Sequence, residues 1–331
     1  MPETDRPKIG LALSGGSGRA IAHIGVLEVL REHNIPIDYI TACSSGAIIA
    51  ASYACGTTDA LKQDWLGLDK KFLFNLFPIN TSGKGIFSMD KVIEFASKYI
   101  QGKKFEEVRP HLGIVCVDVL TAEPIVLAMG DIEKATAASC AVPALFPPVA
   151  WGNRLLVDGG LFSIVPTSQA RDMGADIVIG VDIAATRYAF SQKFHRLRWG
   201  YNILRKSFPV RAYLALHNLF DRAFSRSMNF IFYNQSDFLE EEGLHEPGLF
   251  GILGRAIDIA TERKRDENNQ ILDCDYLISP RVKHLGKIDF QTGHTMLEEG
   301  RRAAAEAIPE IERVINNWNW KKNHRSIKHK I

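Results

Sequence analysis

The sequence predicts an α/β protein, because apolar runs of strand length alternate along it with helical patterns. Two units near the N-terminus, residues 9–30 and 37–54, each have the pattern of a strand, a tight turn and a helix. Farther along, the apolar run Ile177–Asp182 is expected to form another buried strand. With 331 residues, the chain is long enough for one large α/β domain or two ordinary ones.

The first unit joins the expected strand Ile9–Ser14 to a helix through the glycine-rich turn GGSGRA, residues 15–20. Such a unit invites comparison with dinucleotide-binding proteins, but the pattern G-x-G-x-x-G fails from both Gly15 and Gly16. A run of backbone N–H groups at the start of a helix also suits an anion. The turn is therefore a candidate oxyanion hole, which needs such donors close to a nucleophile.

The second unit contains the candidate nucleophile. An extended run, Ile37–Ala42, meets two serines and a glycine and continues into a helix of small residues, Ala47–Ala54. In a nucleophile elbow of pattern G-x-S-x-G, the central serine stands clear of the sheet. That serine is Ser44, although Ala42 replaces the first glycine. The pentapeptide alone leaves the role open, because similar sequences occur in ordinary strand-to-helix turns.

The rest of the chain supplies further elements. We expect a helix at Met89–Ile100, strands at Leu112–Val119 and Pro124–Met129, a short helix that leads into a proline-rich loop within residues 135–151, a brief strand at Leu155–Val157, a last strand at Asp275–Ser279 and a helix from Thr295 to about Asn317.

A serine hydroxyl needs a base before it can attack, and the usual base is histidine. A triad in the chain order Ser, Asp, His would need a histidine downstream of both other residues. The candidates among the ten histidines all lie in helical or polar segments: His195, His217, His245, His284 and His294. His23 is expected to be a packed or surface residue. Asp158, which ends a strand and precedes Gly159 and Gly160, is the better candidate base, because the glycines allow a close approach to the elbow.

Composition narrows the class of protein. The chain is 46% apolar with a mean hydropathy of -0.06, which is typical of a globular protein with a sizeable core, and its net charge of +2 gives no reason to expect a nucleic-acid partner. Five cysteines without a CxxC pair indicate reduced, buried thiols. We expect a cytoplasmic protein without signal peptide or membrane span, and contact with the inner membrane face stays open.

Two basic segments bear on that contact. Residues 187–236 contain nine Lys/Arg and one acid among many aromatic residues. A helix that covers the core with a solvated basic face is the preferred interpretation, and a lid or membrane-surface helix is the alternative. The tail WNWKKNHRSIKHKI is expected to be a mobile, solubilising end, with contact to anionic lipid as the alternative.

The sequence resembles the patatin-like phospholipase family, specifically the bacterial branch similar to the patatin domain of neuropathy target esterase. Four segments carry the resemblance in the family's order: IGLALSGGSGRAIAHIGVLEVL, ACSSGAIIAASYA, ASCAVPALFPPV and LLVDGGLFSIVP. It is close over residues 8–182 and looser over 276–315. It implies a three-layer α/β/α fold with a mostly parallel sheet, in a single domain 8–315 with a mainly helical, lid-like part at 187–270 and a tail at 316–331.

The resemblance also implies an activity, the hydrolysis of phospholipid or lysophospholipid acyl esters by a Ser–Asp dyad. By motif position, Ser44 is the nucleophile and Asp158 the base. The oxyanion-hole positions are Gly15, Gly16, Ser17 and Gly18, and the supporting positions are Arg19, Ser45, Gly46, Gly159 and Gly160. A carboxylate base needs no metal, so neither calcium nor another cofactor is expected. Assembly as a homo-oligomer stays open.

Three positions depart from the family pattern. Ser17 and Ala20 replace glycines of the loop, and Ala42 replaces the first elbow glycine. A catalytically weak or inactive lipid-binding regulator is therefore the alternative function. An acyl-carrier transacylase is a further alternative, but it needs a histidine partner for the serine.

Overall fold

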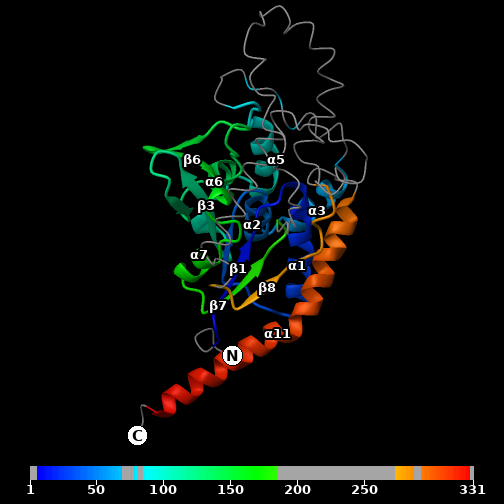
Figure 1. The fold of residues 1–331 in the computed structure, drawn as a ribbon, viewed down its shortest axis with the longest axis vertical. Coiled ribbons are helices and arrows are strands. Elements are labelled where there is room, and N and C mark those ends of the chain that lie inside the picture. The colour runs from blue at the N-terminus through cyan, green and yellow to red at the C-terminus, as the bar shows by residue number, and fades with distance from the viewer. Residues whose placement is uncertain are drawn as a thin grey trace, which may run out of the picture.

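The structure is a computed structural model that describes residues 6–68, 76, 78, 80, 85–184, 273–286 and 292–328, with side chains as far as Trp318. Within these residues an eight-stranded mixed sheet forms the centre of the fold (Figure 1). Followed from each strand to a hydrogen-bonded neighbour, the strands are β5 (Val149–Trp151), β6 (Arg154–Asp158), β3 (His111–Asp118), β2 (Tyr39–Ala42), β1 (Ile9–Leu13), β7 (Ile177–Val181) and β8 (Tyr276–Ile278), and β4 (Pro124–Leu127) also pairs with β3. The strands from β3 to β8 in this order are parallel, whereas β4 and β6 run antiparallel to β3. The predicted α/β class with a mostly parallel sheet is confirmed.

Helices cover both faces of the sheet, because alternate strand residues point to opposite sides. In β7, Ile177 and Ile179 belong to the main core, whereas Val178 between them joins a second cluster with Ala170 of α7 (Thr167–Asp172). The helices that contribute to the main core are α1 (Ile21–Glu32), α2 (Ser45–Cys55), α3 (Thr58–Leu66), α5 (Asp90–Ile100), α6 (Ile132–Ser139) and α11 (Gly293–Lys328). The fold therefore has three layers.

The strands that lead to the two candidate residues meet on one edge of β3. β2 pairs with the first half of β3, as far as the pair Ala42–Ile114, and β6 pairs with the second half, from the pair Cys116–Asp158. β4 occupies the opposite edge across both halves. Because β2 is parallel and β6 antiparallel to β3, their C-terminal ends face each other along this edge. This arrangement brings Ser44, which follows β2, next to Asp158.

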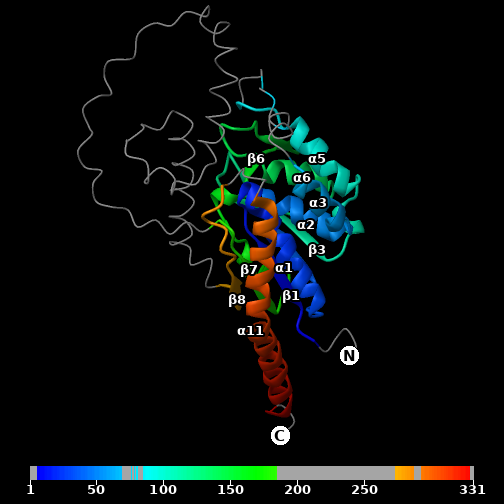
Figure 2. The same cartoon turned by 90° about the vertical axis from the view of Figure 1, so that its right-hand side faces the viewer.

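The long C-terminal helix α11 packs along α1 in near backbone contact (Figures 1 and 2). A Cβ on Gly25 of α1 would lie 2.2 Å from the Leu297 carbonyl oxygen, and one on Gly300 would lie 2.0 Å from that of Ala22. Only glycine at both positions allows this approach. Residues that lie more than 250 positions apart in the sequence thus form one helix pair.

The expected end of this helix near Asn317 is wrong, because α11 continues to Lys328. Nothing between these residues stops a helix, since the stretch contains neither glycine nor proline. Figure 1 shows α11 changing direction along its length, and Pro309 inside it removes a backbone hydrogen bond and kinks helices.

The other expected elements agree with the structure to within a few residues at their ends. Two of the described α-helices were not predicted: α3, with Leu61 and Trp65 as its only buried residues, has too few apolar positions for a clear period, and α7 is only six residues long. The strand β5 was also missed. The segments 187–236 and 187–270 lie outside the described residues. No described helix combines the length and apolar character that a membrane crossing requires.

Candidate active site

Ser44 occupies the sharp turn between β2 and α2. Its backbone angles, φ 52 and ψ -135, fall in a region that residues with a side chain rarely adopt. Strain of this kind costs about 1–3 kcal/mol and persists only where the surroundings enforce it. The helix α2 begins at the next residue, Ser45. These features are those of a nucleophile elbow.

A buried hydroxyl at the end of α6 holds this turn. The Ser44 N–H donates to Ser139 Oγ at 2.9 Å, and the Ser139 hydroxyl donates to the Val115 carbonyl of β3 at 2.7 Å. Ser139 is fully buried. Sequence reasoning did not single out this residue, although it lies in the segment ASCAVPALFPPV. A serine among the apolar residues of a helix end is the signal that could have found it.

Glycines allow the chain segments of the site to approach one another. A Cβ on Gly46 would lie 2.5 Å from the Ser14 carbonyl oxygen, and one on Gly159 would lie 2.1 Å from that of Val115. A Cβ on Gly15 would lie 2.9 Å from the Cβ of Ser44. The alanine at position 42 is fully buried within the sheet, so its methyl group is accommodated in the core.

The Asp158 carboxyl is buried beside Ser44, with 5% of the residue exposed. The Ser44 side chain lies close enough to lower the pKa of this carboxyl, and the carboxyl oxygen Oδ1 accepts the Gly160 N–H at 2.7 Å. Burial raises the pKa of Asp158 from its ordinary 3.8 to about 6, against the opposing effect of these two groups. At neutral pH the carboxylate is therefore mostly ionised and is a stronger base than an exposed aspartate.

Three buried thiols, those of Cys43, Cys116 and Cys140, lie within electrostatic range of Asp158. Burial first, and then the Asp158 charge, raise the pKa of each thiol. They remain protonated at neutral pH and are poor nucleophiles. Cys43 next to the elbow is thus no competitor of Ser44.

The glycine-rich loop continues into a short 3-10 helix, η1 (Ser17–Ala20). The Gly16 N–H donates to Ser45 Oγ at 3.1 Å, and the Gly15 amide lies close enough to the Cys43 thiol to affect its pKa. The N–H groups of Ser17 and Gly18 open the helix, where no intrahelical acceptor exists for the first amides. Ser17 has a φ of 55, which glycine would adopt without strain and which costs a serine about 1–2 kcal/mol.

Arg19 ties this loop to the C-terminal part of the chain. Its side chain is fully buried, and it donates from Nε to the Leu285 carbonyl at 2.9 Å and from one terminal nitrogen to the Lys283 carbonyl at 2.7 Å. The expected bracing role thus has a geometric basis, and the segment 281–286 is the partner that sequence reasoning missed.

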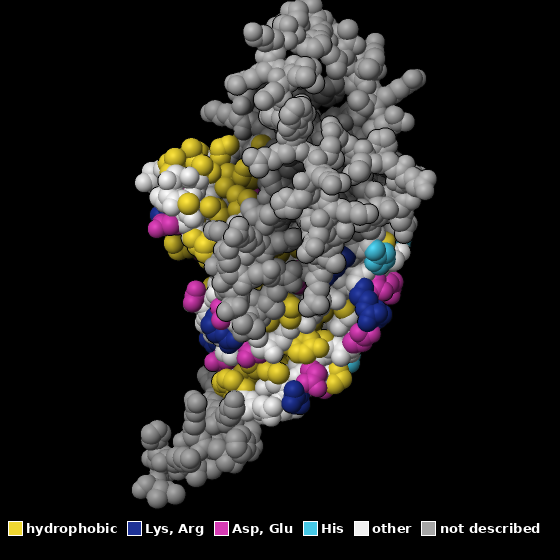
Figure 3. All heavy atoms as spheres, in the orientation of Figure 1, with side chains coloured by type: hydrophobic (Ala, Val, Ile, Leu, Met, Phe, Trp, Pro, Cys, Tyr) yellow, Lys and Arg dark blue, Asp and Glu magenta, His cyan; other side chains and the backbone are white. Residues whose placement is uncertain are grey.

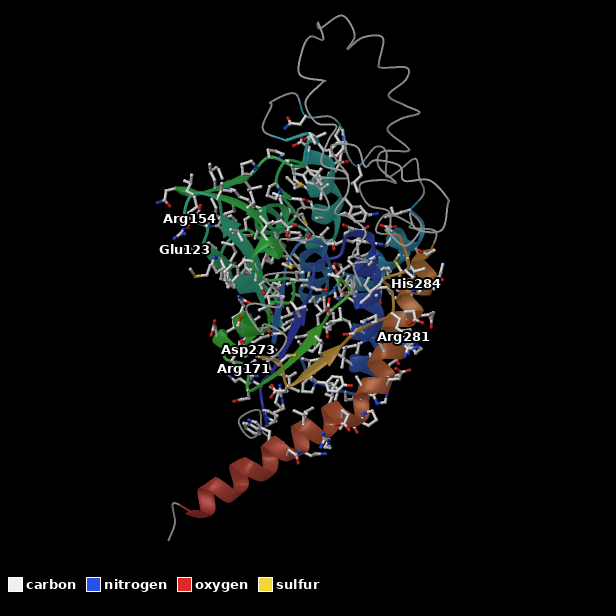
Figure 4. The ribbon with its side chains drawn as sticks, viewed as in Figure 1. Glu123, Arg154, Arg171, Asp273, Arg281 and His284 are labelled. Carbon is white, nitrogen blue, oxygen red and sulfur yellow. The ribbon has the colours of Figure 1, made fainter. Side chains whose placement is uncertain are left out.

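The histidines in the described residues do not contact the Ser44 hydroxyl. His23 is buried and donates from Nε2 to the Ser14 carbonyl at 2.8 Å, and burial lowers its pKa to about 4 despite that bond. His284 and His294 are exposed, and Figure 4 shows His284 on the α11 side of the molecule, away from Arg154 of β6. The positions 195, 217 and 245 lie outside the described residues.

The described residues also contain no group of three or more His, Cys, Asp or Glu side chains arranged to hold a metal ion.

Comparison with known proteins relates this geometry to a family. The sequence model described as patatin-like phospholipase matches residues 11–171. The matched part of the chain, residues 11–171, is therefore patatin-like. The matched range includes the oxyanion-loop positions, the elbow, Ser139 and Asp158, so the whole candidate site lies within the patatin-like part of the chain.

Relatives extend the similarity beyond this range. The chain is 24% identical to an uncharacterised NTE family protein of Mycobacterium bovis, with 92% of each chain covered. A second uncharacterised NTE family protein, of Mycobacterium tuberculosis, is 28% identical over 92% of this chain and 48% of its own length. Patatin-like phospholipase domain-containing protein 6 of Mus musculus is 27% identical over 54% of this chain and 14% of its own length.

Among solved structures, VipD from Legionella pneumophila is similar, at 12% identity with a TM-score of 0.32 over 98% of this chain and 79% of that one.

Proposed function

We propose that the protein hydrolyses acyl esters of phospholipids or lysophospholipids, with Ser44 as the nucleophile and Asp158 as the general base. The observation that carries this proposal is the buried carboxyl of Asp158 beside the Ser44 side chain at a strained elbow. The match of residues 11–171 to the patatin-like phospholipase family supports a lipid as the source of the ester.

In the first half-reaction, Asp158 accepts the Ser44 proton while the serine oxygen attacks the ester carbonyl. The N–H groups of Ser17 and Gly18, with that of Ser45 at the start of α2, stabilise the resulting oxyanion. The negative charge also lies at the N-terminal ends of η1 and α2, where it is favoured. Within the expected oxyanion positions, the Gly16 amide already donates to Ser45 Oγ and is assigned a supporting role.

Collapse of the tetrahedral intermediate breaks the bond to the alcohol or lysolipid, which leaves with the proton from Asp158. Water then attacks the acyl-enzyme, Asp158 accepts a proton from that water, and Ser44 regains a proton as the fatty acid leaves. Every proton transfer in this cycle uses the one carboxyl group.

The test compares wild type, Ser44→Ala and Asp158→Asn on a p-nitrophenyl acyl ester and on a lysophospholipid, with EDTA present. We expect both variants to lose activity by about a thousandfold or more, as removal of a nucleophile or its base does. Ser52→Ala and Asp38→Asn are matched controls, because Ser52 bonds to the Ile49 carbonyl within α2 and Asp38 lies at the end of β2 opposite the elbow. Both controls are expected to retain activity if they fold.

Two results would contradict the proposal. Well-folded wild type without turnover on any chain length would favour the non-catalytic lipid-binding regulator. Activity that persists in Asp158→Asn would mean that another residue is the base.

A further inference from the structure

Exposed apolar side chains are concentrated in one part of the molecule. In the part of the chain that the structure describes, the large hydrophobic side chains that are exposed all lie in two neighbouring hairpins, β3–β4 and β5–β6: Val119 51%, Leu120 68%, Val126 38%, Met129 75% and Leu155 37%. Figure 3 shows hydrophobic side chains gathered over this corner of the sheet. Exposed apolar side chains that gather in one region mark a contact site for a protein or a membrane.

Part of this corner lies at the same end of the sheet as the elbow. The loops after β1, β2 and β3 are at one end because these strands are parallel, so the turn that begins at Val119 is at the end that carries Ser44. The Val119 N–H donates to the Leu155 carbonyl at 2.8 Å. Leu155 precedes Asp158 by three residues of one strand, a separation of about 10 Å.

The tip formed by Val119, Leu120 and Leu155 has an apolar surface with charges only at its border. The turn residues 119–122 are uncharged. Glu123 and Arg154 follow at the border, where Figure 4 labels them, and Arg154 pairs with the buried Asp118 at 3.3 Å. The tip therefore presents an apolar surface close to Asp158, the candidate base. It has no cluster of charges that could bind an oppositely charged partner.

We propose that this tip inserts into a lipid–water interface and so brings the site to its substrate. The inference rests on the proposed function, because a lipid ester in a bilayer is reached only at such an interface. Leu120 and Val119 enter the apolar layer, while Glu123 and Arg154 stay in the headgroup region. Met129 belongs to the same group of exposed residues, but it follows the other end of β4 and does not reach this interface.

The test measures co-sedimentation with phosphatidylcholine vesicles, in the Ser44→Ala background so that hydrolysis does not alter the membrane. Leu120→Ser is expected to weaken partitioning about tenfold and Val119→Ser/Leu120→Ser further, as loss of buried apolar area predicts. Met129→Ser is the matched control, because it removes an equally exposed apolar side chain at the opposite end of the hairpin. We expect Met129→Ser to bind vesicles as well as the Ser44→Ala parent does. Any vesicle binding by the rest of the chain is the same in all variants and cancels in the comparison.

Equal binding by Leu120→Ser and Met129→Ser would overturn the proposal. So would loss of a self-associated form in Leu120→Ser without a change in vesicle binding, because the tip would then be a contact between copies of the chain. In the wild-type background, Leu120→Ser should hydrolyse a soluble p-nitrophenyl ester normally and vesicle lipid more slowly. Vesicle binding does not depend on turnover. The co-sedimentation experiment therefore tests the docking tip alone, and the hydrolysis of the soluble ester tests the proposed catalysis alone.

Discussion

At the residue scale, the buried carboxyl of Asp158 determines the pH at which the proposed dyad can act. Its pKa lies at about 6 because burial disfavours the charged form more than the Ser44 side chain and the Gly160 N–H favour it. Only the ionised carboxylate can accept the serine proton.

We therefore predict that kcat/KM rises with pH, with an inflection near 6 and a plateau above about 7. A pH–rate profile on a p-nitrophenyl ester measures this directly. An inflection near 4, the ordinary range for an exposed aspartate, would contradict the burial argument.

The raised pKa of Asp158 also affects stability. Activity is expected to rise with pH, whereas the free energy of unfolding is expected to fall. The unfolded chain releases the Asp158 proton near 3.8 and the folded chain near 6, so stability is lost as the pH rises through this window. The cost above pH 6 is about 3 kcal/mol. We predict that Asp158→Asn is more stable than wild type at pH 8 and similar to it at pH 4, as denaturant unfolding at the two pH values would reveal. An equal difference at both values would contradict this prediction.

Ser139 gives a second prediction at this scale. Ser139→Ala removes the acceptor for the Ser44 N–H and the donor to Val115, and leaving such buried groups unpaired costs about 1–3 kcal/mol. Because the lost bond holds the backbone of Ser44, the proposed nucleophile, we also expect kcat to fall. Ser52→Ala is the matched control, since the buried Ser52 hydroxyl donates to the Ile49 carbonyl away from the elbow. Equal kcat values in the two variants would contradict the idea that Ser139 positions Ser44.

At the element scale, the elbow depends on the close passage of α2 over the end of β1. Gly46→Ala would place a Cβ 2.5 Å from the Ser14 carbonyl oxygen, and α2 would have to move. We predict a loss of about 1–3 kcal/mol in unfolding free energy and a loss of esterase activity.

Gly67→Ala is the control for this substitution. Gly67 has a φ of -86 and its added Cβ would meet only ordinary contacts, the nearest at 3.5 Å. We expect near-neutral stability. If Gly46→Ala changed the free energy of unfolding as little as Gly67→Ala, the close approach of α2 to the Ser14 carbonyl would be contradicted.

At the scale of the whole molecule, α11 completes the main core and fixes the loop through Arg19. Ile308 and Ile311 of this helix are buried in the core, and the segment before it accepts the Arg19 hydrogen bonds. The first and last parts of the described chain therefore depend on each other for packing.

We predict that Gly300→Ala destabilises the protein by about 3 kcal/mol, because its Cβ would clash with the α1 backbone at 2.0 Å. Helix propensity alone predicts the opposite, since alanine is the better helix former by about 1 kcal/mol. Gly293→Ala is the control, because its Cβ would meet only the end of the Leu66 side chain at 3.2 Å. Thermal unfolding of both variants would decide whether backbone contact between α1 and α11 holds the fold together.

Much of the fold was predictable because it depends on local patterns. The strands β1, β2, β3 and β7 are apolar runs, and a strand buried on both faces leaves that pattern in the sequence whatever its neighbours are. The elbow and the glycine-rich turn are likewise local, since the backbone at these points requires small residues. This is why Ser44 and Asp158 could be proposed as a pair before their distance was known.

Other features became visible only in the tertiary structure, because they depend on contacts between residues far apart in the chain. The shared edge of β3 explains how Ser44 and Asp158 meet, and no local pattern encodes it. Three further features are of the same kind: the contact of Ser139 with the Ser44 amide, the bond of the Gly16 amide to Ser45 Oγ, and the hydrogen bonds of Arg19 to residues 283 and 285. The sequence by itself determined the elements and the candidate chemistry, and tertiary packing decided how Ser44 is held next to Asp158 and how the carboxyl of Asp158 titrates.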